Sequence, residues 1–332
     1  MVVKRALVTG CSGFIGTHLV KTLISTGTYV RGLSRQTDWH HPGVEVFHAD
    51  LTRPETLAGA AKGIDTILHA AGHAHATTSD ADLHRQTTLE GTRNLLAESE
   101  RSKVRTFVFI SSVKAMTEPG DRCIDETARD QPEDEYGKSR RQAEDLVLDA
   151  GRRTGMHVSI LRPTLVYGPG CKGNLAKLLR WIDTGIFPPV PDTGNKRSMV
   201  DVRDLINAIL LAAEKDSASG KTFIITDNQN YSTRRIYNAM RESLGKPLPS
   251  GSVPIWLLRV LGRLGDGVEA LLGRSMFYNS AVCSRLLDSA CYRSGYAHTE
   301  LVFHPKYRIE DALPDIVAEY RNNRDQAEKA SQ

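Results

Sequence analysis

A glycine-rich turn near the N-terminus constrains the fold of this chain more than any other feature. Residues 6–8 are typical of a buried strand, because they lack the polar alternation of a half-exposed one. They lead into Gly10, Gly13 and Gly16, and then into residues 17–25, whose apolar side chains recur at helical spacing. Glycine lets a diphosphate approach the backbone, and a helix N-terminus offers unpaired N–H groups. This order predicts a dinucleotide-binding site; the alternative is a turn that only packs a helix on a sheet.

Strands and helices alternate through the first half of the chain. Helical segments separate most of the short apolar runs that follow the glycine turn, and this alternation predicts an α/β fold built on a doubly wound, parallel Rossmann sheet. The runs that are typical of buried strands span residues 29–35, 44–51, 66–72, 106–112 and 157–161.

The alternation stops after residue 166, where a proline-rich loop and amphipathic segments follow. We therefore expect a smaller C-terminal lobe beside the dinucleotide-binding domain, and a polar tail that frays. The expected domain spans residues 1–166 and 199–231, the lobe spans 167–198 and 232–320, and the tail spans 321–332.

Composition argues against nucleic-acid binding and membrane insertion. The net charge of +4 is spread over the chain without a dense basic run. The longest apolar stretch, residues 253–272, is interrupted by four charged side chains, so it predicts an amphipathic helix rather than a membrane span. Contact of that helix with a membrane surface stays open. The N-terminus has no apolar signal segment, and we expect a cytoplasmic protein. The interrupting charges are Arg259, Arg263, Asp266 and Glu269.

The cysteines and histidines do not predict a metal site. The odd number of cysteines forms neither a CxxC pair nor a metal-ligand spacing, so we expect reduced thiols. His69, His73 and His75 lie close in sequence, but no carboxylate or cysteine completes a ligand set, and we expect surface or hydrogen-bonded imidazoles. The five cysteines are Cys11, Cys123, Cys171, Cys283 and Cys291.

Residues at the strand ends suggest which dinucleotide binds. Ser34 and Arg35 stand at the end of the second strand, where a carboxylate would bind the adenosine ribose of NAD. A cation without a carboxylate suits a 2′-phosphate and favours NADP, although Arg35 could be a solvated surface charge. Asp50 ends the third strand as a candidate partner for adenine. Small residues that would let the cofactor pass close to the backbone end the fourth strand: Ala70, Ala71 and Gly72.

Hydroxyl, phenol and guanidinium groups follow the fifth strand. Ser111 and Ser112 end that strand at the edge of the sheet where open α/β proteins bind ligands. After a loop, Tyr136 and Arg140 are four residues apart and share one face of a predicted helix, whereas Lys138 points elsewhere.

Taken together, these motifs resemble the extended short-chain dehydrogenase/reductase family, especially its nucleotide-sugar epimerases and 4-keto-reductases. The resemblance covers nearly the whole chain, and the set is specific although each motif alone is weak. It implies NAD or NADP as cofactor, a nucleotide sugar bound by the C-terminal lobe, and a homodimer formed by the helices that start near Leu83 and Tyr136. The matching stretches are residues 9–16, 50–51, 69–72, 111–112, 136–139, 162–163, 166–170 and 197–204.

The resemblance also implies roles for individual residues. Tyr136 would exchange a proton with the sugar oxygen, and Ser112 would hydrogen-bond the same oxygen. A phenol has a pKa near ~10, so its anion needs a nearby cation. The family has a lysine there and this chain has Arg140, which keeps its charge but cannot release a proton. A working enzyme with an altered relay, a slow enzyme and a non-catalytic dinucleotide-binding protein remain open. Thr88 replaces a common asparagine of the family.

The remaining site residues come from the same resemblance. Asn174 and Arg197 match positions that hold the substrate diphosphate; alternatively, Asn174 caps a helix and Arg197 pairs with a surface carboxylate. The expected cofactor contacts, besides those named above and the contacts of Tyr136 and Arg140, are Gly10, Gly13, Phe14, Ile15, Gly16, Leu51, Pro163 and Val166.

The two residues after Ser112 narrow the choice of reaction. Family members that dehydrate sugars carry an Asp-Glu pair at these positions, and this chain has Val113 and Lys114. Epimerisation or net reduction at carbon 4 of a UDP-N-acetylhexosamine, for surface polysaccharide synthesis, then remains. Because NADPH suits reduction, Ser34 and Arg35 favour the reductase, with a 4-epimerase as the alternative.

Overall fold

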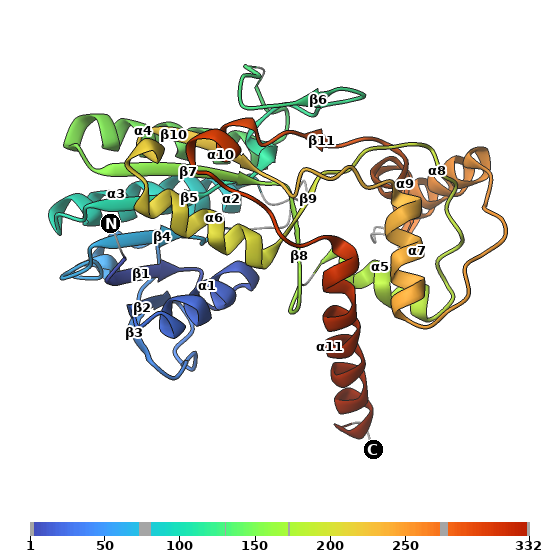
Figure 1. The fold of residues 1–332 in the computed structure, drawn as a ribbon, viewed down its shortest axis with the longest axis horizontal. Coiled ribbons are helices and arrows are strands. Elements are labelled where there is room, and N and C mark those ends of the chain that lie inside the picture. The colour runs from blue at the N-terminus through green and yellow to red at the C-terminus, as the bar shows by residue number, and fades with distance from the viewer. Residues whose placement is uncertain (1–2, 73–80, 130, 172, 273–277, 331–332) are drawn as a thin grey trace.

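The structure, a computed structural model, describes residues 3–72, 81–129, 131–171, 173–272 and 278–330 (Figure 1). Its centre is a seven-stranded sheet in the order β10-β7-β5-β4-β1-β2-β3, in which every neighbouring pair is parallel. This is the predicted Rossmann-type α/β fold. The strands are β1 (Arg5–Thr9), β2 (Tyr29–Ser34), β3 (Val44–His48), β4 (Thr66–His69), β5 (Thr106–Ile110), β7 (His157–Pro163) and β10 (Lys221–Ile225).

Helices cover both faces of the sheet, which explains why most of its strands are apolar throughout. On one face α1 (Phe14–Ser25) and α6 (Val202–Glu214) pack together and share a buried cluster with the strands. On the other face α3 (Gly91–Arg101) and α4 (Glu135–Thr154) do the same (Figure 1). The sheet therefore carries two hydrophobic cores, one on each side.

The helix expected from residue 83 onward is composite. It consists of α2 (Ala81–His84), a π-helical segment η3 (Arg85–Glu90) and α3 in direct succession. Short 3-10 turns occur at η1 (Pro54–Leu57), η4 (Val113–Ala115) and η5 (Asp216–Ala218).

A third hydrophobic cluster lies beside the sheet domain and is built by α5 (Asn174–Asp183), α7 (Thr233–Ser243) and α11 (Ile309–Ala330). Paired strands β8 (Leu165–Tyr167) and β9 (Met199–Asp201) connect it to the sheet. Farther out, α8 (Ile255–Leu272) packs on α9 (Ser280–Leu287). By contrast, α10 (Gly295–Glu300) returns to the sheet domain, where Ala297 joins the α1–α6 core.

The polar C-terminal segment does not fray as expected. Residues 321–330 continue α11, which Asp183 anchors from α5. Its carboxylate accepts hydrogen bonds from Tyr320 Oη at 2.9 Å and from Arg324 Nη1 at 3.1 Å. Within the described residues, we find no helix whose length and hydrophobicity would let it span a membrane.

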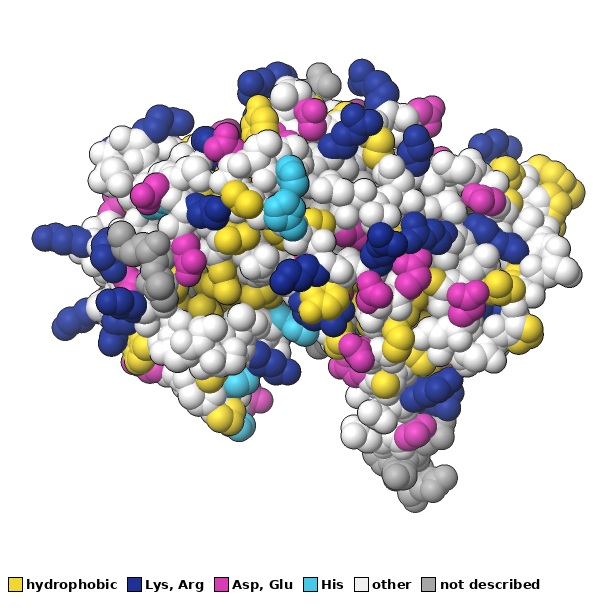
Figure 2. Space-filling model, viewed as in Figure 1, with side chains coloured by type: hydrophobic (Ala, Val, Ile, Leu, Met, Phe, Trp, Pro, Cys, Tyr) yellow, Lys and Arg dark blue, Asp and Glu magenta, His cyan; other side chains and the backbone are white. Residues whose placement is uncertain are grey.

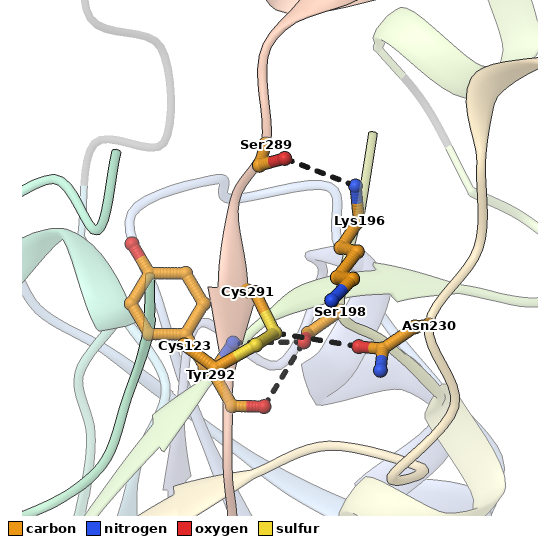
Figure 3. Close-up of a disulfide and its surroundings, with 7 residues drawn as sticks. All are labelled: Cys123, Lys196, Ser198, Asn230, Ser289, Cys291 and Tyr292. Carbon is orange, nitrogen blue, oxygen red and sulfur yellow. Dashed lines mark hydrogen bonds between the residues drawn. A yellow bond between two sulfur atoms is a disulfide. The ribbon is translucent and has the colours of Figure 1, made fainter. Parts of the chain in front are cut away.

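One expectation about the cysteines is wrong. Cys123 and Cys291, which are 168 residues apart, form a disulfide (Figure 3). They lie on β6 (Cys123–Ile124) and β11 (Cys291–Tyr292), whose parallel pairing brings the two Cα atoms to 4.5 Å. Ser198 Oγ fixes β11 through hydrogen bonds with the backbone N and O of Tyr292, at 2.9 and 3.0 Å. Sequence spacing gives no sign of this pairing, since it depends on the tertiary fold.

Candidate functional site

The glycine turn after β1 forms a close-packed cradle. Gly10 has a φ of 67°, and a Cβ there would lie 2.8 Å from the backbone nitrogen of Ala71. A Cβ on Gly16 would overlap the Gly10 carbonyl. Gly13 is the N-cap of α1, where neither a side-chain cap nor an acidic residue occupies the first turn. The helix N-terminus therefore keeps its N–H groups for an anion, as a dinucleotide diphosphate requires.

A buried chain of hydrogen bonds holds the end of β4 beneath this cradle. The backbone N–H of Ala71 donates to Thr9 Oγ1 at 3.1 Å, and Thr9 Oγ1 lies 2.6 Å from His69 Nδ1. On the other side, His69 Nε2 lies 3.0 Å from Thr92 Oγ1, which donates its proton to Thr88 O. Thr92 therefore accepts from Nε2–H, and because the pKa of His69 is lowered to about 3, Nδ1 carries no proton near neutral pH and accepts from Thr9. His69 is thus a neutral imidazole in one defined tautomer.

Burial, and then the charge of Arg140, lower the pKa of His69 to about 3. The ring stacks on Phe109 of β5, with ring centres 5.3 Å apart. His73 and His75 lie outside the described residues. Within the described ranges, no group of three potential ligands is placed to bind a metal.

The candidate adenosine residues gather at the ends of β2 and β3. Ser34 is buried and caps its own turn by accepting a hydrogen bond from Gln36 N at 3.0 Å. Arg35 is exposed and acts electrostatically on Asp50. Burial opposes ionisation of Asp50, but hydrogen bonds from Thr52 and the charges of Arg35 and Arg53 lower its pKa overall. A carboxylate and a guanidinium are therefore neighbours at the ends of β2 and β3.

The first turn of α4 packs directly on the turn that follows β5. Asp134 caps α4 by accepting a hydrogen bond from the backbone N–H of Gly137 at 2.6 Å. A Cβ on Gly137 would overlap the carbonyl oxygen of Lys114, so only glycine allows this approach. Ser112 caps the same turn, with its Oγ 3.2 Å from Lys114 N. The packing brings the elements that carry Tyr136 and Ser112 together, and both side chains are half-buried.

Arg140 lies behind Tyr136 and is buried. Its Nη1 donates to the carbonyl of Ile110 at 3.0 Å, and its guanidinium carbon lies 5.3 Å from the centre of the Tyr136 ring. A Cβ on Gly72 would overlap the guanidinium, so the end of β4 also approaches it closely. The Nε atom is buried without a hydrogen-bond partner among the described residues. A fixed positive charge thus lies beside the phenol ring, where it would stabilise a phenolate.

A buried ion pair sets the position of α4. Arg162 on β7 donates to both carboxylate oxygens of Glu144, at 2.9 and 2.5 Å, and Ser111 Oγ donates to the same carboxylate at 2.6 Å. Glu144 lies one helical turn after Arg140. These three groups link α4 to β5 and β7 and hold the helix that carries Tyr136 in register with the sheet.

The π-helical segment borders the same site. His84, which directly precedes it, meets the Tyr136 ring edge-on at 5.3 Å. Within the segment, the buried Thr88 Oγ1 has no hydrogen-bond partner among the described residues. Sequence analysis identified Thr88 and expected His69 to be a surface or hydrogen-bonded imidazole, but it missed His84 and Glu144. Only the apolar surroundings of His69 in β4 could have signalled its burial.

Asn174 and Arg197, the residues expected to bind the substrate diphosphate, come later in the sequence than Ser112 and Tyr136 and differ in exposure. Asn174 is exposed at the start of α5, where Gly173 rather than Asn174 is the N-cap. Arg197 donates from Nη1 to the carbonyls of Arg285 and Asp288 at 2.5 and 3.3 Å, so it ties the end of α9 to the segment that precedes β9. Burial lowers the pKa of its guanidinium.

The other predicted cofactor contacts lie on several elements of the sheet domain and its connection to the lobe. Phe14 and Ile15 open α1, Leu51 follows Asp50, and the buried Pro163 ends β7. Val166 lies half-buried in β8. The cradle of glycines and the uncapped N-terminus of α1 fit the diphosphate of a nicotinamide dinucleotide.

Comparison with known proteins agrees with this geometry. The profile of the NAD dependent epimerase/dehydratase family matches residues 6–226. A UDP-glucose 4-epimerase of Vibrio cholerae is 33% identical over 281 residues, which cover 81% of this chain and 86% of the relative. An N-acetyl-α-D-glucosaminyl-diphospho-ditrans,octacis-undecaprenol 4-epimerase of Escherichia coli O157:H7 is 28% identical and covers 90% of this chain and 88% of its own.

The fold also matches a solved structure, that of the UDP-glucose 4-epimerase of Thermotoga maritima with UDP-glucose. The two chains superpose with a TM-score of 0.77 at 21% identity, and the match covers 96% of this chain and 99% of the other. By its sequence profile and its relatives, this chain belongs to the NAD-dependent epimerase/dehydratase family, and its cofactor is a nicotinamide dinucleotide.

Proposed function

We propose that this protein is a 4-epimerase that acts on a diphosphate-linked hexose or N-acetylhexosamine, with a UDP-sugar as the first candidate substrate. The observation that carries the proposal is the packing of α4 on the turn after β5, which brings together the elements that carry Tyr136 and Ser112. Two relatives are named as 4-epimerases, and the sugar named for each is linked to a diphosphate. We take the substrate class of the proposal from these two names.

The chemistry divides between the cofactor and the side chains. A bound nicotinamide would supply hydride chemistry at carbon 4 of the sugar, as acceptor and then as donor. The Tyr136 phenol moves the matching proton at the oxygen of carbon 4, and Ser112 hydrogen-bonds that oxygen. Arg140, held by the Ile110 carbonyl, stabilises the phenolate without exchanging a proton itself. Thr88 is available to hold a water molecule in the relay.

A 4-keto-reductase is the second candidate, and Arg35 favours it. This guanidinium directly follows β2, whose last residue is Ser34 rather than a carboxylate, so it suits the 2′-phosphate of NADPH. A reductase must release its oxidised cofactor after each turnover, whereas an epimerase keeps it. The two candidates share the same residues and differ in the fate of the hydride.

A UDP-N-acetylglucosamine labelled with deuterium at carbon 4 distinguishes them. The protein is incubated with this sugar and NAD or NADP, and products are separated and analysed by mass spectrometry and NMR. An epimerase gives the 4-epimer with the label still on carbon 4 and no net change in cofactor absorbance. A reductase, run in the oxidative direction, transfers the label to the cofactor. Dinucleotide binding without turnover of this or a polyprenyl-diphosphate-linked sugar would overturn both proposals in favour of a non-catalytic binding protein.

Two variants test the assigned roles. Tyr136→Phe removes the proton donor and should lower kcat by about 10²–10⁴-fold with cofactor affinity unchanged. Arg140→Lys keeps the charge but shortens the side chain, and it tests whether the relay is adapted to arginine. We expect a lower kcat in Arg140→Lys, because the lysine cannot keep both the Ile110 contact and the guanidinium position. A large gain in kcat would contradict an adapted relay.

A further inference from the structure

The outermost helix of the molecule, α8, exposes an apolar face. Trp256, Val260 and Leu264 are four residues apart and form one line along the helix, and Leu271 continues it two turns later. Trp256 is 66% exposed, Leu264 is 61% exposed and Leu271 is 86% exposed. Figure 2 shows hydrophobic side chains gathered at this end of the molecule, over α8. A water-exposed helix normally turns such a line toward a core.

The opposite side of α8 is fixed against its neighbour. A Cβ on Gly265 would overlap the Tyr278 carbonyl, and a Cβ on Gly262 would lie 3.2 Å from Ser280 Cα. The carboxylate of Asp266 accepts a hydrogen bond from Ser280 N at 3.0 Å. This close packing on α9 prevents the helix from rotating its apolar line inward.

Basic residues border the apolar line. Arg259 and Arg263 are exposed, one turn apart, on the edge of α8 that lies between the apolar line and α9. Both line a pocket of about 190 Å³, which is completed by Ser280, Cys283, Ser284, Leu287 and Asp288. Two guanidinium groups outnumber the single carboxylate of this pocket, that of Asp288, and with the two serine hydroxyls beside an apolar stripe they match a phosphate headgroup beside acyl chains.

We propose that α8 docks on the surface of an anionic lipid bilayer, with its apolar line in the acyl boundary and Arg259 and Arg263 on lipid phosphates. The helix would lie on the membrane and not cross it. A second copy of the chain is the less favoured occupant, because α8 is at the opposite end of the molecule from α3 and α4, the helices expected to pair in a dimer (Figure 1). The proposal holds for either substrate class proposed above.

Vesicle flotation tests the proposal directly. The full chain is mixed with vesicles of phosphatidylcholine alone or of phosphatidylcholine with phosphatidylglycerol, and the bound fraction is measured. We expect binding to the anionic vesicles with a blue shift of Trp256 fluorescence. Leu264→Glu should weaken it by about tenfold or more, because a charge would enter the acyl boundary. Arg263→Gln should weaken it by about fivefold on anionic vesicles only.

Controls separate membrane binding from folding and from activity. Tyr296→Glu places the same charge on an apolar residue that is 45% exposed on α10, in the sheet domain, and should bind as the parent does. All variants should keep the parent circular dichroism spectrum and its turnover of UDP-sugars without vesicles. Failure of the parent to bind anionic vesicles, or equal binding by Leu264→Glu and Tyr296→Glu, would overturn the proposal. The proposal would also be overturned if light scattering showed a smaller oligomer for Leu264→Glu than for the parent. In that case α8 would form an interface between two copies of the chain. None of these results depends on the sugar reaction.

Discussion

The buried His69 predicts a specific pH dependence of stability. Its pKa in the folded protein is about 3, against 6.5 for a free imidazole, because burial and the Arg140 charge oppose protonation. Below about pH 6.5 the unfolded chain therefore binds a proton at this site and the folded chain does not. Unfolding is favoured as the pH falls through this window, so His69 makes the protein less stable toward acid.

The size of this effect comes from linkage. At about pH 5 the unfolded state gains RT ln(1 + 10^1.5), or about 2 kcal/mol, from protonation of this one group. The folded state gains almost nothing there, because its pKa lies well below 5. Other groups also titrate between about pH 7.5 and about pH 5. The quantity to measure is therefore the difference in the free energy of unfolding between the parent and a variant without the imidazole.

His69→Gln is that variant. At about pH 7.5 it should lose about 1–3 kcal/mol, because glutamine cannot serve both Thr9 and Thr92 as the ring does. At about pH 5 this deficit should shrink by about 2 kcal/mol. Urea unfolding followed by circular dichroism measures both values. His48→Gln, at the exposed end of β3, serves as the matched control. An equal deficit of His69→Gln at both pH values would show that the folded protein does not hold His69 neutral.

Three further perturbations test the geometry. Gly16→Ala should abolish dinucleotide binding, because the methyl group would overlap the Gly10 carbonyl; NADPH fluorescence titration measures it, and parent-like affinity would refute the cradle. Arg162→Met should lower the free energy of unfolding by about 3–5 kcal/mol, since it leaves the Glu144 carboxylate buried and unpaired, and adding Glu144→Leu should restore much of the loss. Reduction of the disulfide by dithiothreitol should lower the free energy of unfolding by about 2–5 kcal/mol. If the oxidised and the reduced protein unfolded at the same urea concentration, this expectation would be wrong.

Local sequence pattern predicts much of the sheet domain. The helix expected from the apolar spacing of residues 17–25 is found as α1 (Phe14–Ser25), because that periodicity is a local signal. The strands were predicted for a similar reason, since buried parallel strands are continuous apolar runs. The π-helical segment at 85–90 was not predicted, because one extra residue per turn leaves the apolar pattern nearly unchanged.

The features that sequence analysis missed depend on distant partners. The disulfide joins residues 168 positions apart. Glu144 has no local mark that separates it from the other charged residues of α4, and only the fold brings Arg162 to it. The apolar line of α8 could be read from sequence as amphipathic, but its outward orientation requires knowledge of what packs on the opposite side. The sequence pattern therefore predicts helices and strands better than it predicts which distant residues will contact them.

The order of strands in the sheet has a consequence for synthesis of the protein. β10 is an edge strand that pairs with β7, yet the chain emerges from the ribosome with β8, α5, β9 and α6 between them. Until residue 225 has appeared, β7 offers an unpaired edge and the core beneath α6 lacks Phe223 and Ile225. Such an edge invites pairing with other nascent chains. A shortened version that ends before β10 should therefore aggregate when expressed, so an N-terminal piece with the whole sheet must extend past residue 225 and include α5.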